Sequence, residues 1–394
     1  MIEQLERGRA LILPRLEALM TRFGDDLAGI NAWGPDVCRR VLAYSNRGKM
    51  IRGSLVIAAA EAFGSGSESP GRALAGDAAS GTGTASTAVV DAACAMELLQ
   101  SFLLIHDDIM DNDDTRRGAP SVHAQYRDGA EGWGVRDHTD GAAGNARDAF
   151  GRSMAICAGD VTLLLAQRVL AALDVADDVY RRVNSLVARE IALVGIAQMN
   201  DLYFGYLAES DAEVTVTKDD VYKLYRYKTG RYTFSLPLAM GAVFAGLSGG
   251  GLDLLMAYGE EVGIVFQVVD DDIGLFGETE ATGKPVGSDI IADKKTLHRQ
   301  YLLEALDGSD AGTRDRVVAH FGDPGLDHRG VEEVRDLLES HGVRKRIGAI
   351  LDDHADRARR IAGEIVASCL PREARGRARA LLDGIVDYNV ARRV

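Results

Sequence analysis

The sequence has few cysteines, and they are scattered. Cys38, Cys94, Cys157 and Cys369 lie far apart, with no CxxC pair and no histidine at the spacing of a zinc ligand. Disulfide scaffolds and zinc sites depend on closely spaced cysteines, so the sequence indicates neither. We expect all four cysteines to be small buried residues.

Basic charge is also scarce relative to acidic charge. The chain has 45 Lys and Arg against 59 Asp and Glu, which gives a formal charge of −14. Binding to a nucleic-acid backbone depends on clustered Lys and Arg. The charge balance therefore argues against a nucleic-acid partner.

Long apolar runs are missing as well. The N-terminal sequence MIEQLERGRALILPRLEAL mixes charges with apolar residues at helical spacing and lacks the apolar core of a signal peptide. No apolar run approaches the roughly 18 residues that a membrane span needs. These absences predict a cytoplasmic protein with no transmembrane segment.

Apolar residues that are broken up by polar ones, in contrast, are abundant. They make up 46% of the chain, which is enough for a large core. Several segments are apolar on nearly all faces, as is typical of helices inside a bundle. The pattern predicts an all-α, single-domain helical bundle around a central apolar cavity. The clearest helical segments are 86–106, 150–174, 176–204, 252–269 and 343–369.

Two segments interrupt this pattern. Residues 64–85 and 128–147 are rich in Gly, Ser and Asp and are predicted to be flexible surface insertions. We expect one domain over residues 1–394, because the chemistry below needs residues from both sides of each insertion.

A first acidic motif, LLIHDDIMDNDDTRRG, follows an apolar helix. Asp107 and Asp111 are one turn apart, so their carboxylates share a face of the helix. Like charges at a helix C-terminus repel each other and oppose the macrodipole, which favours a bound cation. Oxygen ligands on an open rim suit Mg²⁺. The alternative is a solvated acidic helix end.

A second acidic motif, GIVFQVVDDDIGLFGE, repeats this design. An apolar helix that carries Gln267 leads to Asp270, Asp271 and Asp272. Two such helices in one chain weaken the alternative of a solvated end. The predicted metal ligands are Asp107, Asp108, Asp111, Asp270 and Asp271.

The motifs HDDIMDNDDTRRG and FQVVDDDIG resemble the two aspartate-rich motifs of the trans-isoprenyl diphosphate synthase (polyprenyl synthetase) family. The resemblance runs from about residue 45 to about residue 300 and includes NRGKMIRG, YRYKTGRYTF and ETEATGKPVGSDIIADKKT. It implies a short-chain prenyltransferase that joins isopentenyl diphosphate to an allylic diphosphate (C5 to C15). It also implies Mg²⁺ as the cofactor, with three ions per site and Mn²⁺ as a substitute, and a homodimer.

The resemblance implies roles for basic residues too. Lys49, Arg52 and Arg117 would bind the diphosphate of isopentenyl diphosphate, and Gln100 would add a contact. Fixed cationic donors suit phosphate groups. Viewed alone, Lys49 and Arg52 would be ordinary surface charges.

The allylic diphosphate has its own set of residues in the family pattern. Lys228, Thr229 and Gln267 would be catalytic, with Lys228 at the diphosphate and the Thr229 dipole facing the developing carbocation. Further basic contacts implied by the resemblance are Arg116, Lys284 and Lys294.

Some positions depart from the family pattern. Gly274 stands where many members have the last Asp of the second motif, so metal binding there should depend on Asp270, with Asp271 in support. Gln198 and Asp201, in GIAQMND, line the site at best. His106 is interpreted as structural.

Product length is suggested by the helix before the first motif. Asp111, Asp107, Leu103 and Leu99 form an i, i+4 stripe, so a tail pocket should follow Leu103 and Leu99. Phe102 lies beside this stripe, and an aromatic residue there resembles members that stop near C20. Geranylgeranyl diphosphate is therefore the expected product, with farnesyl diphosphate or a longer chain as alternatives. Phe102 could also simply fill the core.

Two other functions fit part of the sequence. A class I terpene cyclase would share the helical fold but would have an Asn/Ser/Glu-type motif in place of DDDIG. A non-catalytic subunit of a heteromeric synthase would have lost aspartates from one motif, whereas the first motif here is intact.

Overall fold

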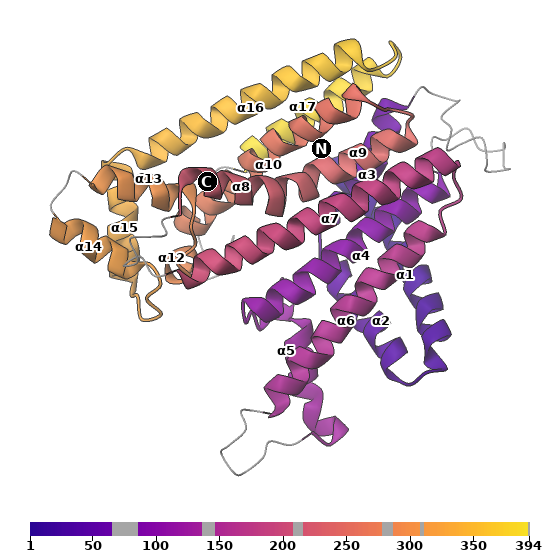
Figure 1. Ribbon diagram of the computed structural model, residues 1–394, viewed down its shortest axis with the longest axis horizontal. Coiled ribbons are helices and arrows are strands. Elements are labelled where there is room, and N and C mark those ends of the chain that lie inside the picture. Colours follow the sequence, from indigo (N-terminus) through magenta and orange to yellow (C-terminus); the bar gives the residue numbers. More distant parts are fainter. Residues whose placement is uncertain (65–85, 136–145, 208–215, 278–286, 308–310, 393–394) are drawn as a thin grey trace. The chain divides into compact units, whose positions relative to one another are not determined.

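The computed structural model describes residues 1–64, 86–135, 146–207, 216–277, 287–307 and 311–392. Apart from one two-residue hairpin, the regular structure of these residues is helical, which confirms the all-α prediction (Figure 1). The described residues divide into two compact units. The N-terminal unit is 2–182 with 241–246, and the C-terminal unit is 183–240 with 247–394 and Met1.

The N-terminal unit is built around one apolar helix, α4 (Thr87–Met110). It packs against α1 (Ile2–Ala28), α3 (Ile51–Phe63) and α6 (Ala146–Ala171). The side chain of Ser86 caps the first turn of α4 by accepting a hydrogen bond from the Val89 amide. Most of the apolar residues of α4 are buried, so its position is fixed by packing on several faces.

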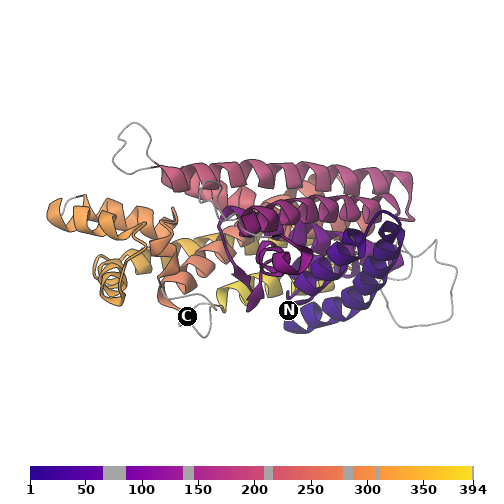
Figure 2. The same cartoon turned by 90° about the horizontal axis from the view of Figure 1, so that it is seen from below.

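The other elements of this unit surround α4. The indigo helices of Figure 2 include α1 and α2 (Trp33–Asn46), which pack against each other. After α4 come a hairpin and two short helices before α6. They are β1 (Thr115–Arg116), β2 (Ala119–Pro120), α5 (Val122–Gly129) and the 3-10 helix η2 (Ala130–Trp133).

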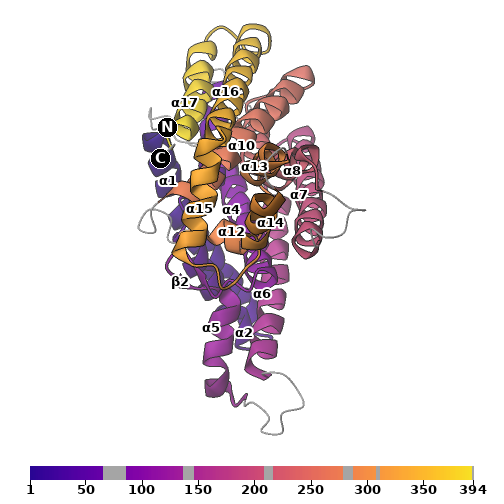
Figure 3. The same cartoon turned by 90° about the vertical axis from the view of Figure 1, so that its left-hand side faces the viewer.

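The C-terminal unit has α10 (Gly250–Phe276) at its centre. This helix packs against α16 (Val343–Ser368) and α17 (Arg375–Val390), and the three lie side by side in Figures 1 and 3. It also packs against η3 (Tyr225–Ser235). The remaining helices are α7 (Asp177–Tyr206), α8 (Lys218–Leu224), α9 (Leu236–Phe244), α12 (Ser288–Ile291), α13 (Leu297–Leu306), α14 (Ala311–His320) and α15 (His328–Ser340). Of these, α7 and α9 run across the division between the units.

The element η3 is a π-helix, a rare form that often marks functional positions. Its last turn is closed by the amide of Leu236, which donates to the carbonyl of Arg231. Gly230 of η3 lies against Gly263 of α10, and a side-chain carbon added at Gly263 would overlap the Gly230 backbone. Two glycines therefore allow the π-helix to lie directly on α10.

Two helices are long and apolar enough to cross a membrane by composition, although the sequence predicted no apolar run of that length. They are α4 and α6, with mean hydropathies of 1.7 and 1.5 over their most apolar 18 residues. In α4, 78% of that stretch is buried inside the protein, as in a core helix, and in α6 the share is 44%. Core packing is the physical reason for the hydropathy of α4.

Other expectations from the sequence are met only in part. Cys38 and Cys94 are buried, but Cys157 on α6 is exposed and Cys369 is partly exposed, so the prediction of four buried cysteines was wrong for these two. The single domain over 1–394 and the two flexible insertions remain predictions. Most of 64–85 lies outside the described residues, whereas 128–133 complete α5 and form η2.

Candidate functional site

The first acidic motif lies at the end of α4, as expected. Asp107 is in the last turn, Asp111 caps the helix, and Asn112 then takes a left-handed conformation with φ of 54°. The residues differ in exposure, because Asp111 is exposed and Asp107 partly so, whereas Asp108 is fully buried. Asp107 and Asp111 can therefore meet a solvent cation, while Asp108 faces the interior.

Asp108 is held by two partners. The Tyr44 hydroxyl donates to its Oδ2 at 2.7 Å, and Nε of Arg116 donates to its Oδ1. Arg116 also reaches Asp107 at 3.4 Å and Asp113 at 3.3 Å. Burial raises the pKa of Asp108, and the charge of Arg116 opposes this shift. A buried carboxylate needs such partners, so this group orients the motif.

The hairpin after α4 places two arginines. Thr115 pairs with Pro120 and Arg116 with Ala119, and the turn between the strands consists of Arg117 and Gly118. Both turn residues have positive φ, 54° and 72°, which is the conformation of a two-residue hairpin turn. Arg116 is thereby turned toward the acidic motif.

Arg117 is directed to the segment that carries Lys49 and Arg52. Its guanidinium lies against the backbone of Gly48, where any side chain would overlap it. Lys49 is exposed just before α3, and Arg52 is in the first turn of that helix. The N-terminus of a helix favours anions. The structure therefore places Arg117 beside the segment that carries Lys49 and Arg52, and their role as a diphosphate site stays a prediction.

Two polar side chains of α4 lie under these cations. Glu97 is buried and accepts a hydrogen bond from the Gly53 amide at 2.7 Å. Burial raises the pKa of Glu97, while the charges of Arg52 and Arg117 oppose the rise. Gln100 is 8% exposed, and its Oε1 has no hydrogen-bond partner among the residues described. An unsatisfied buried amide of this kind is costly unless a ligand or water pairs with it.

The stripe below the first motif is partly buried. Leu99 is buried, and Leu103 and Phe102 are partly exposed. The rings of Phe102 and His106 meet edge to face at 5.1 Å, and His106 pairs with Asp160 at 3.4 Å. His106 thus supports Phe102, which agrees with a structural role.

The second acidic motif lies in the last turns of α10, which continues to Phe276 beyond the aspartates. Its aspartates also have different roles. Asp270 is partly exposed and pairs with Arg392, near the end of the chain. Asp271 is buried, and Asp272 pairs with Arg344 at 3.2 Å.

Asp271 is surrounded by hydrogen-bond donors. The Tyr225 hydroxyl donates to its Oδ2, and Nε2 of Gln267 donates to its Oδ1 at 2.9 Å. The Leu297 amide in turn donates to the Tyr225 oxygen at 3.1 Å. Burial raises the pKa of Asp271 to about 6 despite these hydrogen bonds. Like Asp108, this residue faces the interior.

The π-helix η3 places Lys228 and Thr229 near the second motif. The Thr229 hydroxyl donates to Oε1 of Gln267 at 2.9 Å, so Gln267 links Thr229 to Asp271. Lys228 forms an ion pair with Asp201 of α7. The structure brings the three predicted catalytic residues of this unit together.

Asp289 lies beside the position where the second motif has Gly274. A side-chain carbon at Gly274 would overlap the Asp289 carboxylate, which therefore fills the space beside Gly274. Asp289 forms an ion pair with Lys294 at 2.7 Å. Lys284 lies outside the described residues.

The carboxylates of the first motif suit a magnesium ion whose remaining coordination positions are filled by water and a substrate. No group of three or more His, Cys, Asp and Glu converges into a metal cage within the described ranges. Mg²⁺ commonly takes one or two carboxylates, together with water and substrate phosphate oxygens. Asp111, which is exposed, and Asp107, which is partly exposed and one turn before it, provide such a donor set.

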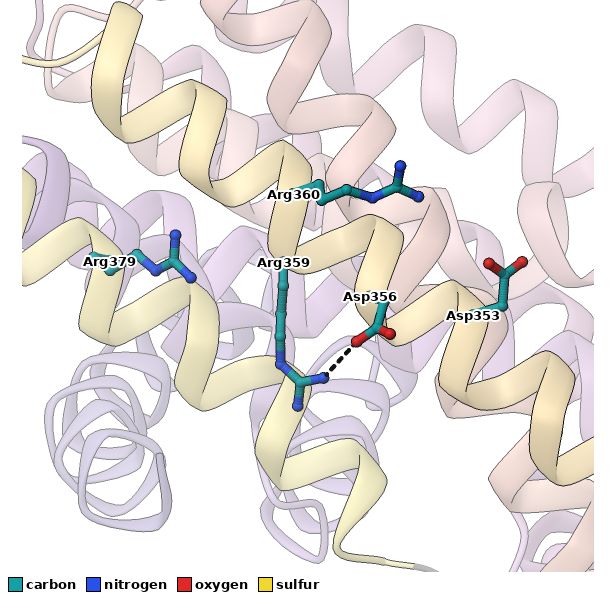
Figure 4. A pocket seen from close by; sticks show the side chains of 5 residues that line it. All are labelled: Asp353, Asp356, Arg359, Arg360 and Arg379. Carbon is teal, nitrogen blue, oxygen red and sulfur yellow. Dashed lines mark hydrogen bonds and ion pairs between the residues drawn. The ribbon is translucent and has the colours of Figure 1, made fainter.

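A separate surface pocket between α16 and α17 is not part of this site. Its lining is entirely charged and contains none of the predicted residues (Figure 4). Arg359 pairs with Asp356 at 3.3 Å and with Asp387 at 2.9 Å, so its charge is already matched. The lining residues are Asp353, Asp356, Arg359, Arg360 and Arg379.

Sequence reasoning missed the residues that hold the motifs. Tyr44 and Tyr225 are far from the aspartates in sequence, and single tyrosines give no signal. Arg392 follows the last helix, where a basic residue is unremarkable. Glu97 lies one turn before Ser101 in α4 and could have been noticed as a charge inside an apolar helix.

Comparisons with known proteins agree with these features. The polyprenyl synthetase family matches residues 35–335. A geranylgeranyl diphosphate synthase of Mycobacterium tuberculosis is 33% identical over 298 residues, 74% of this chain and 70% of that protein. A (2E,6E)-farnesyl diphosphate synthase of the same species is 30% identical over 343 residues, 85% of this chain and 79% of that protein.

Solved structures give the same result. A geranylgeranyl pyrophosphate synthase from Corynebacterium glutamicum, in complex with isoprenyl diphosphate and magnesium, has a TM-score of 0.81. It is 25% identical, and the match covers 99% of each chain.

The two aspartates Asp108 and Asp111 should respond differently to substitution. Asp108→Ala removes the acceptor of the buried Tyr44 hydroxyl and the nearest of the three carboxylates around Arg116, so the free energy of unfolding should fall by about 3 kcal/mol. Asp111→Asn should change it by less than about 0.5 kcal/mol, since it is exposed, but should weaken Mg²⁺ binding. Urea unfolding without metal and Mg²⁺ titration calorimetry measure the two effects. Equal loss of stability in both variants would contradict this division of roles.

Proposed function

The chain belongs to the polyprenyl synthetase family, and from this membership we propose that it condenses isopentenyl diphosphate with an allylic diphosphate. It is an enzyme, a short-chain trans-prenyltransferase. Its relatives are named as geranylgeranyl and farnesyl diphosphate synthases. We propose geranylgeranyl diphosphate as the product, with farnesyl diphosphate as the alternative.

One observation supports the proposal most directly, the common construction of the two acidic motifs. In each, the second aspartate is buried and accepts a hydrogen bond from a tyrosine, Tyr44 for Asp108 and Tyr225 for Asp271. In each, the first aspartate is accessible and carries an arginine as its counter-ion. This arrangement suits metal binding at both motifs, where a metal ion would replace the arginine beside the first aspartate.

The proposed reaction begins at the allylic diphosphate. The allylic carbon–oxygen bond breaks, and its electron pair stays on the departing diphosphate. Mg²⁺, held by Asp107, Asp111 and Asp270 with three ions per site, would supply positive charge to that leaving group when bound. Lys228 would add a fixed positive charge.

The second step joins the two substrates. Lys49, Arg52 and Arg117 hold the diphosphate of isopentenyl diphosphate, and Gln100 can contact it as well by donating from its Nε2. The double bond of isopentenyl diphosphate attacks the allylic cation and forms the new carbon–carbon bond. Loss of a proton to the released diphosphate completes the product. Thr229, aligned by Gln267, directs its dipole at the cation.

Product length would be limited by Phe102. It is partly exposed and lies beside the stripe of Leu99 and Leu103, five residues before Asp107. His106 holds its ring from the side. A tail that grows along the stripe would meet this aromatic ring.

The proposal includes a homodimer in the cytoplasm. Large apolar side chains are exposed on α6 (Ile156 and Leu164) and on α7 (Ile196 and Met199). Leu164 and Met199 are each 66% exposed, which is unusual outside an interface. The burial of α4 supports a location in solution rather than in a membrane.

Activity can be tested with labelled isopentenyl diphosphate and C5, C10 or C15 allylic partners, followed by product sizing. We expect linear products that need Mg²⁺ and vanish with chelator. The double variant Asp107→Asn/Asp111→Asn should be at least about 100-fold slower, while Asp178→Asn, at an exposed position of α7, should be unchanged. Cyclic products made without isopentenyl diphosphate would indicate a terpene cyclase, and no turnover by the chain alone would indicate a partner subunit.

Phe102→Ala should shift the products to longer chains, because it removes the ring that limits the pocket. Leu104→Ala is the matched control, since it lies on the same helix but off the stripe. Chromatography of the dephosphorylated products measures chain length. An unchanged distribution in Phe102→Ala would exclude this role.

The dimer predicts a mass in solution of twice the chain mass of 42.3 kDa. Leu164→Glu places a charge on the exposed surface of α6 and should shift the protein toward monomer in light scattering. Ile30→Glu, at a 75% exposed position after α1, should not. A wild-type monomer would contradict the dimer.

A further inference from the structure

The catalytic residues Lys228 and Thr229 lie on an unusual piece of backbone. They are in the middle of η3, where the π-helical turn differs from the α-helix that precedes it. A π-helix is less favourable than an α-helix and is retained where surrounding contacts hold it. The contacts that hold η3 therefore decide where Lys228 and Thr229 point.

Glycine contact fixes only one side of η3. Gly230 lies against Gly263 of α10, which sets how closely the two helices approach. This contact has no directional bonds, so it does not fix the rotation of η3 about its own axis. Directional contacts are needed for that. Tyr225, the first residue of η3, makes one with Asp271, and the turn that follows Thr229 needs another.

Arg231, directly after Gly230, makes such a contact. Its Nε and Nη2 donate to Oε2 and Oε1 of Glu190 on α7, both at 2.7 Å, and its Nη1 donates to Glu260 on α10. The guanidinium thus ties η3 to two helices. The planar fork of arginine has the geometry for this paired contact, which lysine lacks.

The ion pair between Arg231 and Glu190 is largely buried. The side chain of Glu190 is 0% exposed and that of Arg231 is 15% exposed, whereas Glu260 is 22% exposed. Among the residues that the structure describes, Glu190 has one other cationic partner, Arg189, whose Nε is 2.9 Å away but whose side chain is 56% exposed. Arg231 is therefore the main counter-charge of a carboxylate that has no access to water.

We propose that Arg231, held by Glu190 and Glu260, is a positioning residue that fixes the π-helical turn and so aligns Lys228 and Thr229 with Gln267. The inference rests on the proposed function, because it assigns no new reaction and deepens the role of that site. Replacing a buried ion pair by apolar residues often leaves stability unchanged. A buried pair that contributes little net stability can still hold one geometry.

The main competing explanation is that the ion pair only stabilises the fold. Three variants separate the two explanations. Arg231→Gln removes the fork and leaves Glu190 without its main partner. Glu190→Leu/Arg231→Met removes both charges, and Glu260 keeps a contact with Arg226 at 3.1 Å. Arg182→Gln, which breaks an exposed pair with Asp178 on α7, is the control.

Three quantities are measured for each variant: the melting temperature, the kcat and KM values for both substrates, and the affinity for inorganic pyrophosphate in Mg²⁺. Arg231→Gln should lower the melting temperature and reduce kcat by about 10- to 100-fold, with an unchanged KM for isopentenyl diphosphate. In Glu190→Leu/Arg231→Met the melting temperature should recover while kcat stays low. Arg182→Gln should behave as wild type.

Recovery of kcat together with the melting temperature in the double variant would overturn the inference. Failure of the proposed function would be seen separately, as a wild-type chain that consumes no isopentenyl diphosphate. In that case the affinity for pyrophosphate in the presence of Mg²⁺ still tests the role of Arg231. Misplacing Lys228 should weaken this affinity about tenfold in both Arg231 variants. Wild-type affinity in those variants would contradict it.

Discussion

The hydrogen bond from a tyrosine to the second aspartate is the interaction on which both acidic motifs depend. A carboxylate that is removed from water must be hydrogen-bonded or paired with a charge. Tyr44 and Arg116 meet this need for Asp108, and Tyr225 and Gln267 meet it for Asp271. Each buried aspartate fixes the end of its helix and leaves the preceding aspartate accessible.

The cations near the motifs are placed mainly by the backbone. Arg117 lies against the segment of Lys49 and Arg52 because its own φ is positive and because Gly48 leaves room for its guanidinium. Lys228 and Thr229 depend on a π-helix that lies on α10 through two glycines. At both places a residue without a side chain allows the close approach.

The long helices and the two acidic motifs could be predicted from the sequence because their signals are local. The segments 86–106 and 252–269 correspond to α4 and α10, and the aspartates are at their C-terminal parts. The partners could not be predicted, since Tyr44 and Tyr225 are brought to the aspartates only by folding. The carboxylate beside Gly274 could not be predicted either, because Asp289 comes from another helix.

The exposure of Cys157 shows a different limit of sequence reasoning. Its helix, α6, is apolar enough to suggest complete burial, yet only part of that helix is covered in the single chain. Composition reports how apolar a helix is and not what covers each face. Ile156 and Leu164 on the same helix are exposed for the same reason.

The number of magnesium ions bound in the presence of inorganic pyrophosphate tests the central claim most directly. The claim is that the first aspartate of each motif binds the metal ion, while the buried second aspartate holds the motif in position. Calorimetric titration should therefore show fewer bound ions for Asp107→Asn and, separately, for Asp270→Asn than for the wild type. An unchanged number of ions in either variant would contradict the claim.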